Sequence, residues 1–174
     1  MRILGIDPGL ERTGYGVVEL AAPAGSLSTG SGVGAPRLVE AGIIRTKPGD
    51  PLAERLAEIL TGLEAVIAEF RPQGVAVEEL YSHYAHPRTA ILMGHARGAA
   101  FLAAARAGVP VTSYAATHIK KALTGSGHAS KEQMQRAVQS MFNLRKTPEP
   151  PDVADALAVA LCHAHRTTRL ALAR

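Results

Sequence analysis

Acidic side chains end two short apolar segments of this chain and begin a third. Asp7 follows the apolar run 3–6, and Glu78 and Glu79 follow the apolar run 74–77. Because each run is too short for a helix and is bounded by turn residues, we expect two buried strands. A carboxylate at the end of a buried strand costs several kcal/mol unless water, a cation or a basic group accompanies it. We therefore expect these acids to be accompanied by water, a cation or a basic group.

Asp152 and Asp155 supply two further carboxylates at the start of an expected final helix, 152–168. They are three residues apart and therefore share a helix face. Acids in a first helical turn also occur simply because they complement the helix dipole and the free N–H groups. The following residues, 153–161, are apolar apart from Asp155, which indicates burial against a sheet. The acidic turn is then fixed close to the strand ends, where the sites of α/β folds collect.

Together these positions predict a set of four carboxylates. Successive strand residues point to opposite faces, so only one of Glu78 and Glu79 can lie beside Asp7, and the periodicity does not choose between them. Four converging carboxylates repel one another unless cations lie between them, and hard oxygen ligands favour Mg²⁺ or Mn²⁺. Two such ions activate a water and stabilise the leaving oxygen in attack on phosphorus. The set therefore predicts phosphodiester hydrolysis without a side-chain nucleophile.

The elements that must position these acids follow an α/β order. We expect strands at 3–7, 15–20, 38–46, 74–80 and 109–113 and helices at 51–70, 87–107, 115–123, 130–142 and 152–168. Strands followed by alternating helices and strands predict an α/β fold with a five-stranded mixed sheet flanked by helices. The first two strands pair as a hairpin, because Pro8 fixes a turn and Gly9 and Gly14 permit turn conformations.

Two of the expected helices show specific local signals. In helix 51–70 the apolar residues repeat at helical spacing, and Arg55 falls on the solvent side with the glutamates. Helix 130–142 begins with a capping box formed by Ser130 and Gln133. Helix 87–107 is rich in Gly and Ala, which allows close approach by a neighbour; core packing and a subunit contact explain this equally well.

Length and composition favour a single domain over residues 1–174. The segment 21–37, rich in Gly, Ser, Ala and Pro, is predicted to be a flexible loop. The one cysteine, Cys162, cannot form an internal disulfide, and its alanine-rich surroundings indicate a buried residue. The sequence shows no secretion signal and no apolar run of about 20 residues that would span a bilayer. We therefore expect a cytoplasmic protein.

Charge is distributed unevenly along the chain. Residues 1–79 contain 7 Lys and Arg against 11 Asp and Glu, whereas residues 80–174 contain 12 against 4. Two of those four acids are Asp152 and Asp155, so the second half predicts a basic surface with one acidic spot. Such a surface favours a polyanionic partner.

Four segments of the chain resemble the RuvC family of bacterial Holliday junction resolvases. They read GIDPGLERTGYGV (5–17), AVEELY (76–81), MGHARGAA (93–100) and DVADALAVA (152–160). The resemblance implies an RNase H-like fold and a structure-selective crossover junction endodeoxyribonuclease. Such an enzyme cuts four-way DNA junctions by paired nicks in recombination and repair. The resemblance also implies a metal-binding catalytic set, which selects Glu78 over Glu79 and consists of Asp7, Glu78, Asp152 and Asp155.

The resemblance further implies cofactors and partners. Each site is expected to use two Mg²⁺ ions, with Mn²⁺ as a substitute, and the protein is expected to work with a branch-migration complex of RuvA and RuvB type proteins. It also implies a homodimer. Independently of the resemblance, a junction with near two-fold symmetry that needs two cuts matches two identical sites related by a two-fold axis.

DNA-binding residues are suggested at five positions. In the family an aromatic residue shortly after the strand-four glutamate stacks on junction DNA, and Tyr81 occupies that place, as a tyrosine rather than the expected phenylalanine. Lys120 and Lys131 fall where family lysines approach the phosphates. Arg88 and Arg97 are further candidates for salt-sensitive phosphate contacts.

Three other functions compete with this hypothesis. A related RNase H-like nuclease acting on structured RNA would share the same acids. A non-catalytic junction-binding protein would need at least one acid replaced. An actin-like or sugar-kinase-like phosphotransferase also begins with a strand, an Asp and a Gly-rich turn, but it needs a second lobe for which 174 residues leave no room.

Overall fold

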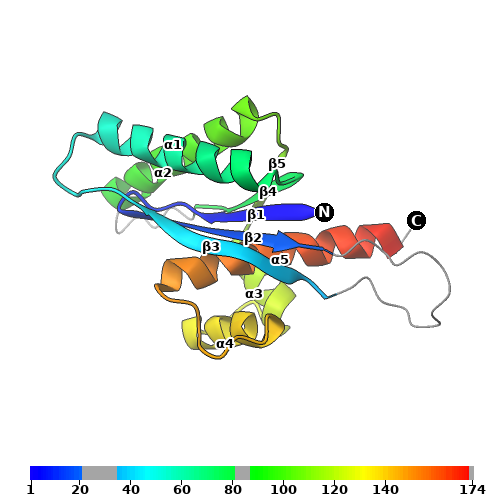
Figure 1. Cartoon of the computed structure of the whole chain (residues 1–174). Coiled ribbons are helices and arrows are strands. Elements are labelled where there is room, and N and C mark those ends of the chain that lie inside the picture. Colours follow the sequence, from blue (N-terminus) through cyan, green and yellow to red (C-terminus); the bar gives the residue numbers. More distant parts are fainter. Residues whose placement is uncertain (21–34, 81–86, 173–174) are drawn as a thin grey trace.

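The computed structural model of the chain describes residues 1–20, 35–80 and 87–172. A five-stranded sheet lies between two layers of helices (Figure 1). The strands are β1 (Arg2–Asp7), β2 (Arg12–Glu19), β3 (Arg37–Arg45), β4 (Gly74–Glu78) and β5 (Val111–Tyr114). The helices are α1 (Leu52–Phe70), α2 (Pro87–Arg106), α3 (Ala116–Thr124), α4 (Lys131–Met141) and α5 (Pro151–Leu172).

The α/β fold with a mixed five-stranded sheet is therefore confirmed. The largest differences from the expected bounds are at the start of β2, which begins at Arg12 rather than 15, and at the end of α5, which continues to Leu172 rather than 168. Residues 21–34 of the predicted flexible loop lie outside the described residues. In the part that the structure describes, none of the helices has the length and apolar character needed to cross a membrane.

β1 occupies the centre of the sheet, whose strand order is β3-β2-β1-β4-β5. It pairs antiparallel with β2, where Asp7 lies opposite Gly14, and parallel with β4, where Ile6 lies opposite Val77. The carboxyl ends of β1 and β4 consequently lie side by side. This is the edge at which the sequence places its first two groups of acids.

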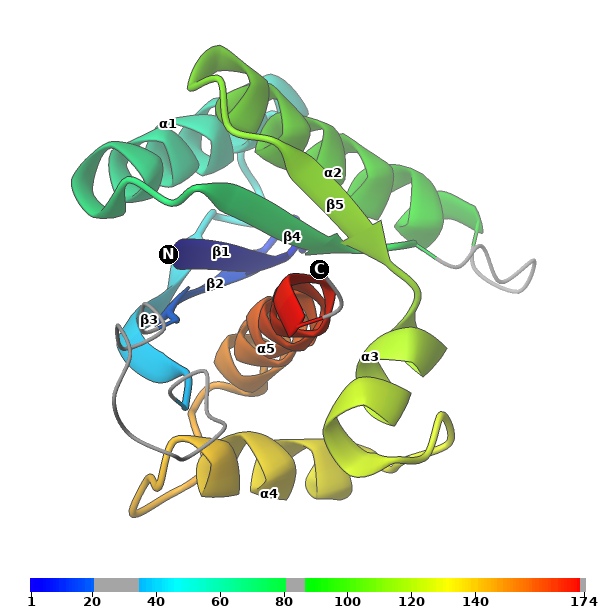
Figure 2. The same ribbon diagram turned by 90° about the vertical axis from the view of Figure 1, so that its right-hand side faces the viewer.

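Helices cover both faces of the sheet, with α1 and α2 on one side and α3, α4 and α5 on the other (Figure 2). Because helices cover both faces of the sheet at its central strand, β1 is apolar on both sides. Leu4 and Ile6 pack in the core cluster with α1 and α2, and Ile3 packs in the cluster with α5. Alternation along the strand then places Gly5 and Asp7 on the α5 side.

α5 lies directly on β1 and β2 because glycines leave room for it. A Cβ atom at Gly5 would meet the carbonyl oxygen of Ala156, and one at Gly14 would meet the carbonyl oxygen of Asp152. Gly14 lies inside β2 and is not among the positive-φ glycines. The expected turn-forming role of Gly14 is therefore wrong; glycine is needed there because the backbone of α5 comes so close.

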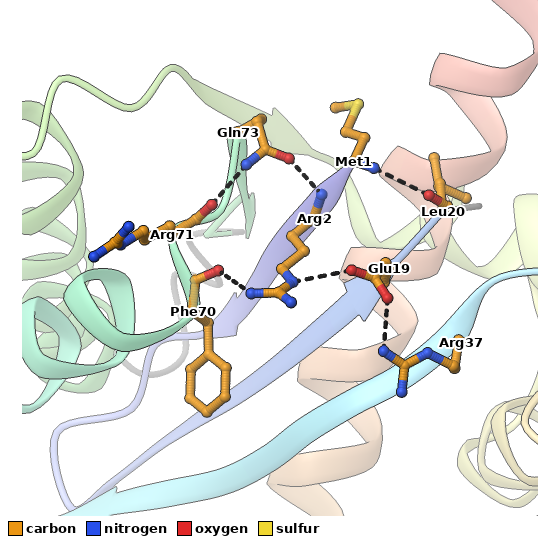
Figure 3. A network of polar contacts seen from close by, with 8 residues as sticks. All are labelled: Met1, Arg2, Glu19, Leu20, Arg37, Phe70, Arg71 and Gln73. Carbon is orange, nitrogen blue, oxygen red and sulfur yellow. Dashed lines mark hydrogen bonds and ion pairs between the residues drawn. The ribbon is translucent and has the colours of Figure 1, made fainter. Parts of the chain in front are cut away.

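A polar network holds the opposite, amino-terminal end of β1 (Figure 3). Arg2 donates from Nε to Glu19 Oε1 at 3.1 Å and from Nη1 to the Phe70 carbonyl oxygen at 3.0 Å. Arg37 Nη2 donates to the second carboxylate oxygen of Glu19 at 2.6 Å. Gln73 Oε1 accepts from the backbone N–H of Arg2 at 2.6 Å. These bonds join β1 to β2, β3 and the end of α1 and so fix the position of the central strand.

One charged residue of α1 departs from the expected pattern. Arg55 is only 8% exposed, although the helical spacing places it with the solvent-facing glutamates. Its Nε donates to Thr46 Oγ1 at 2.9 Å, and that hydroxyl donates to the carbonyl oxygen of Leu10 at 2.6 Å. The guanidinium therefore binds the loops at the ends of β1 and β3 to α1, and its assignment to the solvent side is wrong.

Candidate active site

Asp7 and Glu78 end the neighbouring parallel strands β1 and β4. Their preceding residues, Ile6 and Val77, are paired in the sheet and both pack toward α1 and α2. Alternation of strand side chains therefore directs both carboxylates to the α5 face. The pKa of Asp7 is shifted by the charge of Glu78, whereas Glu79 is not among the charges that shift it. The register of the sheet thus pairs Asp7 with Glu78, a choice that the sequence periodicity left open.

Asp152 and Asp155 come from the first turns of α5. The close contact between the Asp152 backbone and Gly14, which lies opposite Asp7 in the hairpin, brings Asp152 to the end of β1. Asp155 follows at i+3 and lies on the same side of the helix. The glycines that admit α5 to the sheet therefore also place its acidic turn.

The other three acids lie near enough to Asp7 for their charges to shift its pKa. Burial, followed by the negative charges of Asp155, Glu78 and Asp152, raises the pKa of Asp7 to about 7. Its ordinary value is 3.8. Each of the other three acids thus acts on the same buried carboxyl group, and the cluster carries more negative charge than its surroundings favour.

Glu78 is also buried beside other acids, but two lysines offset part of the effect on its pKa. Burial and then the charge of Asp155 raise the pKa of Glu78, while Lys120 and Lys131 lower it. These two lysines are therefore near enough to the carboxylates to stabilise their ionised forms.

Basic partners orient two of the four acids. Arg12 Nη1 lies 3.7 Å from Asp152 Oδ2, and Lys131 Nζ lies 3.3 Å from Asp155 Oδ2. Among the residues that the structure describes, no three His, Cys, Asp or Glu side chains are close enough to form a metal-binding group. The acids are therefore neighbours, but Asp152 and Asp155 face Arg12 and Lys131 rather than one shared point.

Lys131 owes its position to the start of α4. The backbone N–H of Gln133 donates to Ser130 Oγ at 3.3 Å, and the backbone N–H of Ser130 donates to Gln133 Oε1 at 2.8 Å. This confirms the predicted capping box. Because the cap fixes the first turn of α4, it also fixes the lysine that faces Asp155.

A cleft of about 210 Å³ opens beside the acids, between β4, α3, α4 and α5. Its charged lining consists of Glu78, Asp155, Lys120 and Lys131, and the remainder includes Ile119 and other apolar side chains. The cleft thus combines carboxylates for a cation with lysines for an anion. Such a combination suits a phosphate group whose charge changes during reaction.

The chemistry of the four carboxylates fits a hard divalent cation. They offer only oxygen ligands, as Mg²⁺ and Mn²⁺ prefer. The raised pKa values of Asp7 and Glu78 show an excess of negative charge that a cation would neutralise. To bind such a cation, the side chains of Asp152 and Asp155 would have to leave their ion pairs with Arg12 and Lys131.

Arg97, one of the suggested DNA-binding residues, makes several contacts within the protein. Its Nε donates to the carbonyl oxygen of Glu78 at 3.3 Å and its Nη2 donates to Ser113 Oγ at 2.8 Å. Its guanidinium carbon lies 4.3 Å from the centre of the Phe101 ring. The side chain therefore connects α2 to β5 and to the end of β4 at Glu78.

The other suggested DNA-binding positions differ in their surroundings. Arg88 is exposed in the first turn of α2, and Lys120 and Lys131 line the cleft. Tyr81 lies outside the described residues. Binding of DNA by these side chains stays a prediction.

Two features of the site were missed by sequence reasoning. The ion pair of Arg12 with Asp152 joins residues far apart in the chain, and no local pattern indicates it. The contacts of Arg97 with Glu78 and Ser113 also depend on the packing of α2 against the sheet. Arg12 and Arg97 do lie within the motifs GIDPGLERTGYGV and MGHARGAA, which is the only signal the sequence offers.

Known proteins resemble this chain over almost its whole length. The family model for the crossover junction endodeoxyribonuclease RuvC matches residues 3–163. The RuvC protein of Rhodopirellula baltica is 51% identical over 160 residues, which cover 92% of this chain and 84% of that protein. The RuvC protein of Pelotomaculum thermopropionicum is 45% identical over 168 residues, with 97% and 95% covered.

Solved structures agree with the sequence comparisons. The structure of Thermus thermophilus RuvC superposes with a TM-score of 0.85 at 38% identity and covers 97% of this chain and 96% of that chain. The yeast mitochondrial Holliday junction resolvase Ydc2 has a TM-score of 0.62 at 10% identity, with 97% and 81% covered, and so shares the fold. The expected RNase H-like fold is confirmed, and the chain belongs to the RuvC family of crossover junction endodeoxyribonucleases.

Proposed function

We propose that this protein resolves four-way DNA junctions by symmetric paired nicks during homologous recombination and DNA repair. Its family membership supports the endodeoxyribonuclease activity. A T. thermophilus RuvC structure in complex with a Holliday junction substrate, 37% identical and with a TM-score of 0.85, supports the choice of DNA. The observation that carries the proposal is that the paired ends of β1 and β4 and the first turns of α5 bring Asp7, Glu78, Asp152 and Asp155 to the same end of the sheet, where the charges of the other three raise the pKa of Asp7.

In this proposal Asp7, Glu78, Asp152 and Asp155 are the catalytic residues, and they hold two Mg²⁺ ions, which Mn²⁺ can replace. Paired divalent cations supply an activated water and stabilise the leaving oxygen of a phosphodiester. The rigid ends of β1 and β4 and the first turns of α5 hold the ligands. The ligands therefore need little reorganisation of the backbone.

Arg12 and Lys131 then have a second role. While they pair with Asp152 and Asp155, they neutralise part of the crowded negative charge. If Asp155 bound a cation instead of Lys131, that lysine would be free to bind a phosphate in the cleft together with Lys120.

The remaining partners follow from the two-fold character of the substrate. We infer a homodimer, because two cuts at symmetric positions match two identical sites. We also infer cooperation with a branch-migration complex of RuvA and RuvB type proteins, as in the family that the sequence resembles. Tyr81 is assigned to stacking on junction bases, a role that an aromatic ring suits.

A cleavage assay on three substrates tests the proposal. We expect Mg²⁺-dependent, symmetric cutting of a synthetic four-way DNA junction and little cutting of linear duplex DNA or of an RNA–DNA hybrid. Preferential cutting of the hybrid would favour a structure-selective ribonuclease, and junction binding without any cutting in Mg²⁺ or Mn²⁺ would favour a non-catalytic junction-binding protein. Either result would contradict the proposal.

A further inference from the structure

A second and larger pocket lies on the other side of α3 from the catalytic cleft. It has a volume of about 820 Å³ and lies between α3 and the carboxyl-terminal half of α5. Figure 2 shows α3 beside this end of α5. The basic and histidine side chains that line the pocket are His118, Lys121, His165, Arg166 and Arg169. No acid contributes to the lining.

The sequence explains why this pocket is positive. From residue 80 to 131 and again from 156 to 174 the chain contains no Asp or Glu. The first of these acid-free segments includes α3, the second forms most of α5, and the fold packs these two helices against each other. The pocket is therefore the place where the two segments meet, and its charge comes from both of them.

The cations of the pocket are not neutralised by the described part of the protein. Lys121, Arg166 and Arg169 form no ion pair with any described acid, in contrast to Lys131 beside Asp155. Lys121, Arg166 and Arg169 are exposed. Several like charges around one concavity raise the local concentration of anions.

We propose that this pocket binds the phosphodiester backbone of a junction arm, as a site separate from the catalytic cleft. The inference rests on the proposed function for the identity of the polyanion. Phosphates would be held by Lys121, Arg166 and Arg169 in place of a protein counter-charge. The site gives affinity and takes no part in the cleavage chemistry.

The position of the pocket favours DNA over an acidic protein segment. Consecutive residues of α3 serve the two sites, because Lys120 lines the catalytic cleft and Lys121 lines the second pocket. A helix is about 10–12 Å across, and phosphates of one strand are spaced by about 3.4 Å along the axis. A strand that leaves the cleft and crosses α3 therefore reaches the second pocket within about three to four nucleotides.

The test is junction binding by the double variant Lys121→Gln/Arg169→Gln, measured by fluorescence anisotropy over a series of salt concentrations. We expect the Kd for a four-way DNA junction to rise about tenfold, and the slope of log K against log salt to fall by about 1.8, at about 0.9 per phosphate contact. Cleavage at saturating junction should stay at the rate of the unchanged protein. If the double variant does not fold, Lys121→Gln alone should lower the slope by about 0.9.

The control variant Arg45→Gln/Lys47→Gln removes the same charge from exposed positions at the end of β3 and just beyond it. It should leave the Kd and the salt slope nearly unchanged. Equal effects in the two double variants would overturn the proposal, as would an unchanged Kd in the α3/α5 variant. Loss of binding to a polyglutamate peptide with unchanged junction binding would also overturn it and would identify an acidic protein surface instead. A failure of the proposed function appears separately, as absent cleavage by the unchanged protein.

Discussion

The two ends of α5 carry opposite charges in opposite environments. At the amino-terminal end, Asp152 and Asp155 join Asp7 and Glu78, and burial raises the pKa of the latter two. At the carboxyl-terminal end, Arg166 lines an open pocket that no acid lines. The helix dipole favours the outermost residue of each group, Asp152 in the first turn and Arg169 in the last turn.

The two ends of α5 therefore suit different tasks: the acidic end suits cleavage of the phosphodiester, and the basic end suits binding of the DNA. Buried charges of one sign are costly and become stable only when cations or basic groups approach them. Exposed charges of one sign cost little and attract a polyanion in a salt-sensitive way. Changes at the acidic end should therefore alter the rate of cleavage, and changes at the basic end should alter binding.

The largest effect is expected from Asp7→Asn. This change keeps the size of the side chain and removes the charge on which the other three acids converge. Cleavage of a four-way junction in Mg²⁺ should fall by at least about 10²-fold, a typical cost for a key electrostatic group. Junction binding, measured in parallel, should change little. A nearly normal cleavage rate would show that Asp7 is not part of the reacting centre.

The same variant should change how stability depends on pH. The pKa of Asp7 is raised in the folded protein from 3.8 to about 7, so between these values the folded state binds a proton that the unfolded state has lost. Stability from this group is therefore lost as pH rises through the window, by at most about 4 kcal/mol at about 1.4 kcal/mol per unit.

Thermal unfolding in a chelator should accordingly show that Asp7→Asn raises Tm at about pH 8 more than at about pH 4, because the ionised carboxylate is the destabilising form. Glu11→Gln, a change at an exposed acid in the same hairpin, serves as the control. An equal change in Tm at both pH values would mean that the Asp7 carboxyl is not crowded as described.

Gly14→Ala should damage the acidic end while leaving the basic end intact. Its Cβ would meet the carbonyl oxygen of Asp152, so α5 must move, at a cost of about 1–3 kcal/mol for such overpacking. We expect a lower Tm and a roughly tenfold slower cleavage. Gly49→Ala is the control, because a Cβ there has no atom within 4 Å. Equal Tm and cleavage rate for both variants would show that α5 tolerates the added methyl group.

The smallest effect is expected from Arg97→Gln, which removes the guanidinium beside the Glu78 carbonyl. If Arg97 positions β4, cleavage at saturating junction should fall by less than the effect of Gly14→Ala, while the salt dependence of binding stays unchanged. If it contacts phosphate instead, the salt slope should fall by about 1 and cleavage at saturation should persist. Arg88→Gln, at an exposed position of the same helix, provides the comparison.

Local patterns in the sequence determined much of this protein. The apolar runs before Asp7 and Glu78, the apolar helix after Asp155, and the Ser130 capping box all appear in the structure as predicted. These features depend on a residue and its near neighbours along the chain. For that reason strand and helix positions, and the list of candidate acids, follow from sequence.

Only the tertiary structure decided how those elements meet. The parallel pairing of β1 with β4 places Glu78, and not Glu79, beside Asp7. The close approach of the α5 backbone explains why a glycine is needed at position 14. Burial of Arg55 against Thr46 reversed the expectation from helical periodicity. The positive pocket arose because two acid-free segments pack together, although they lie far apart in the chain. Register, close approach and burial are relations between distant residues, so no local pattern contains them.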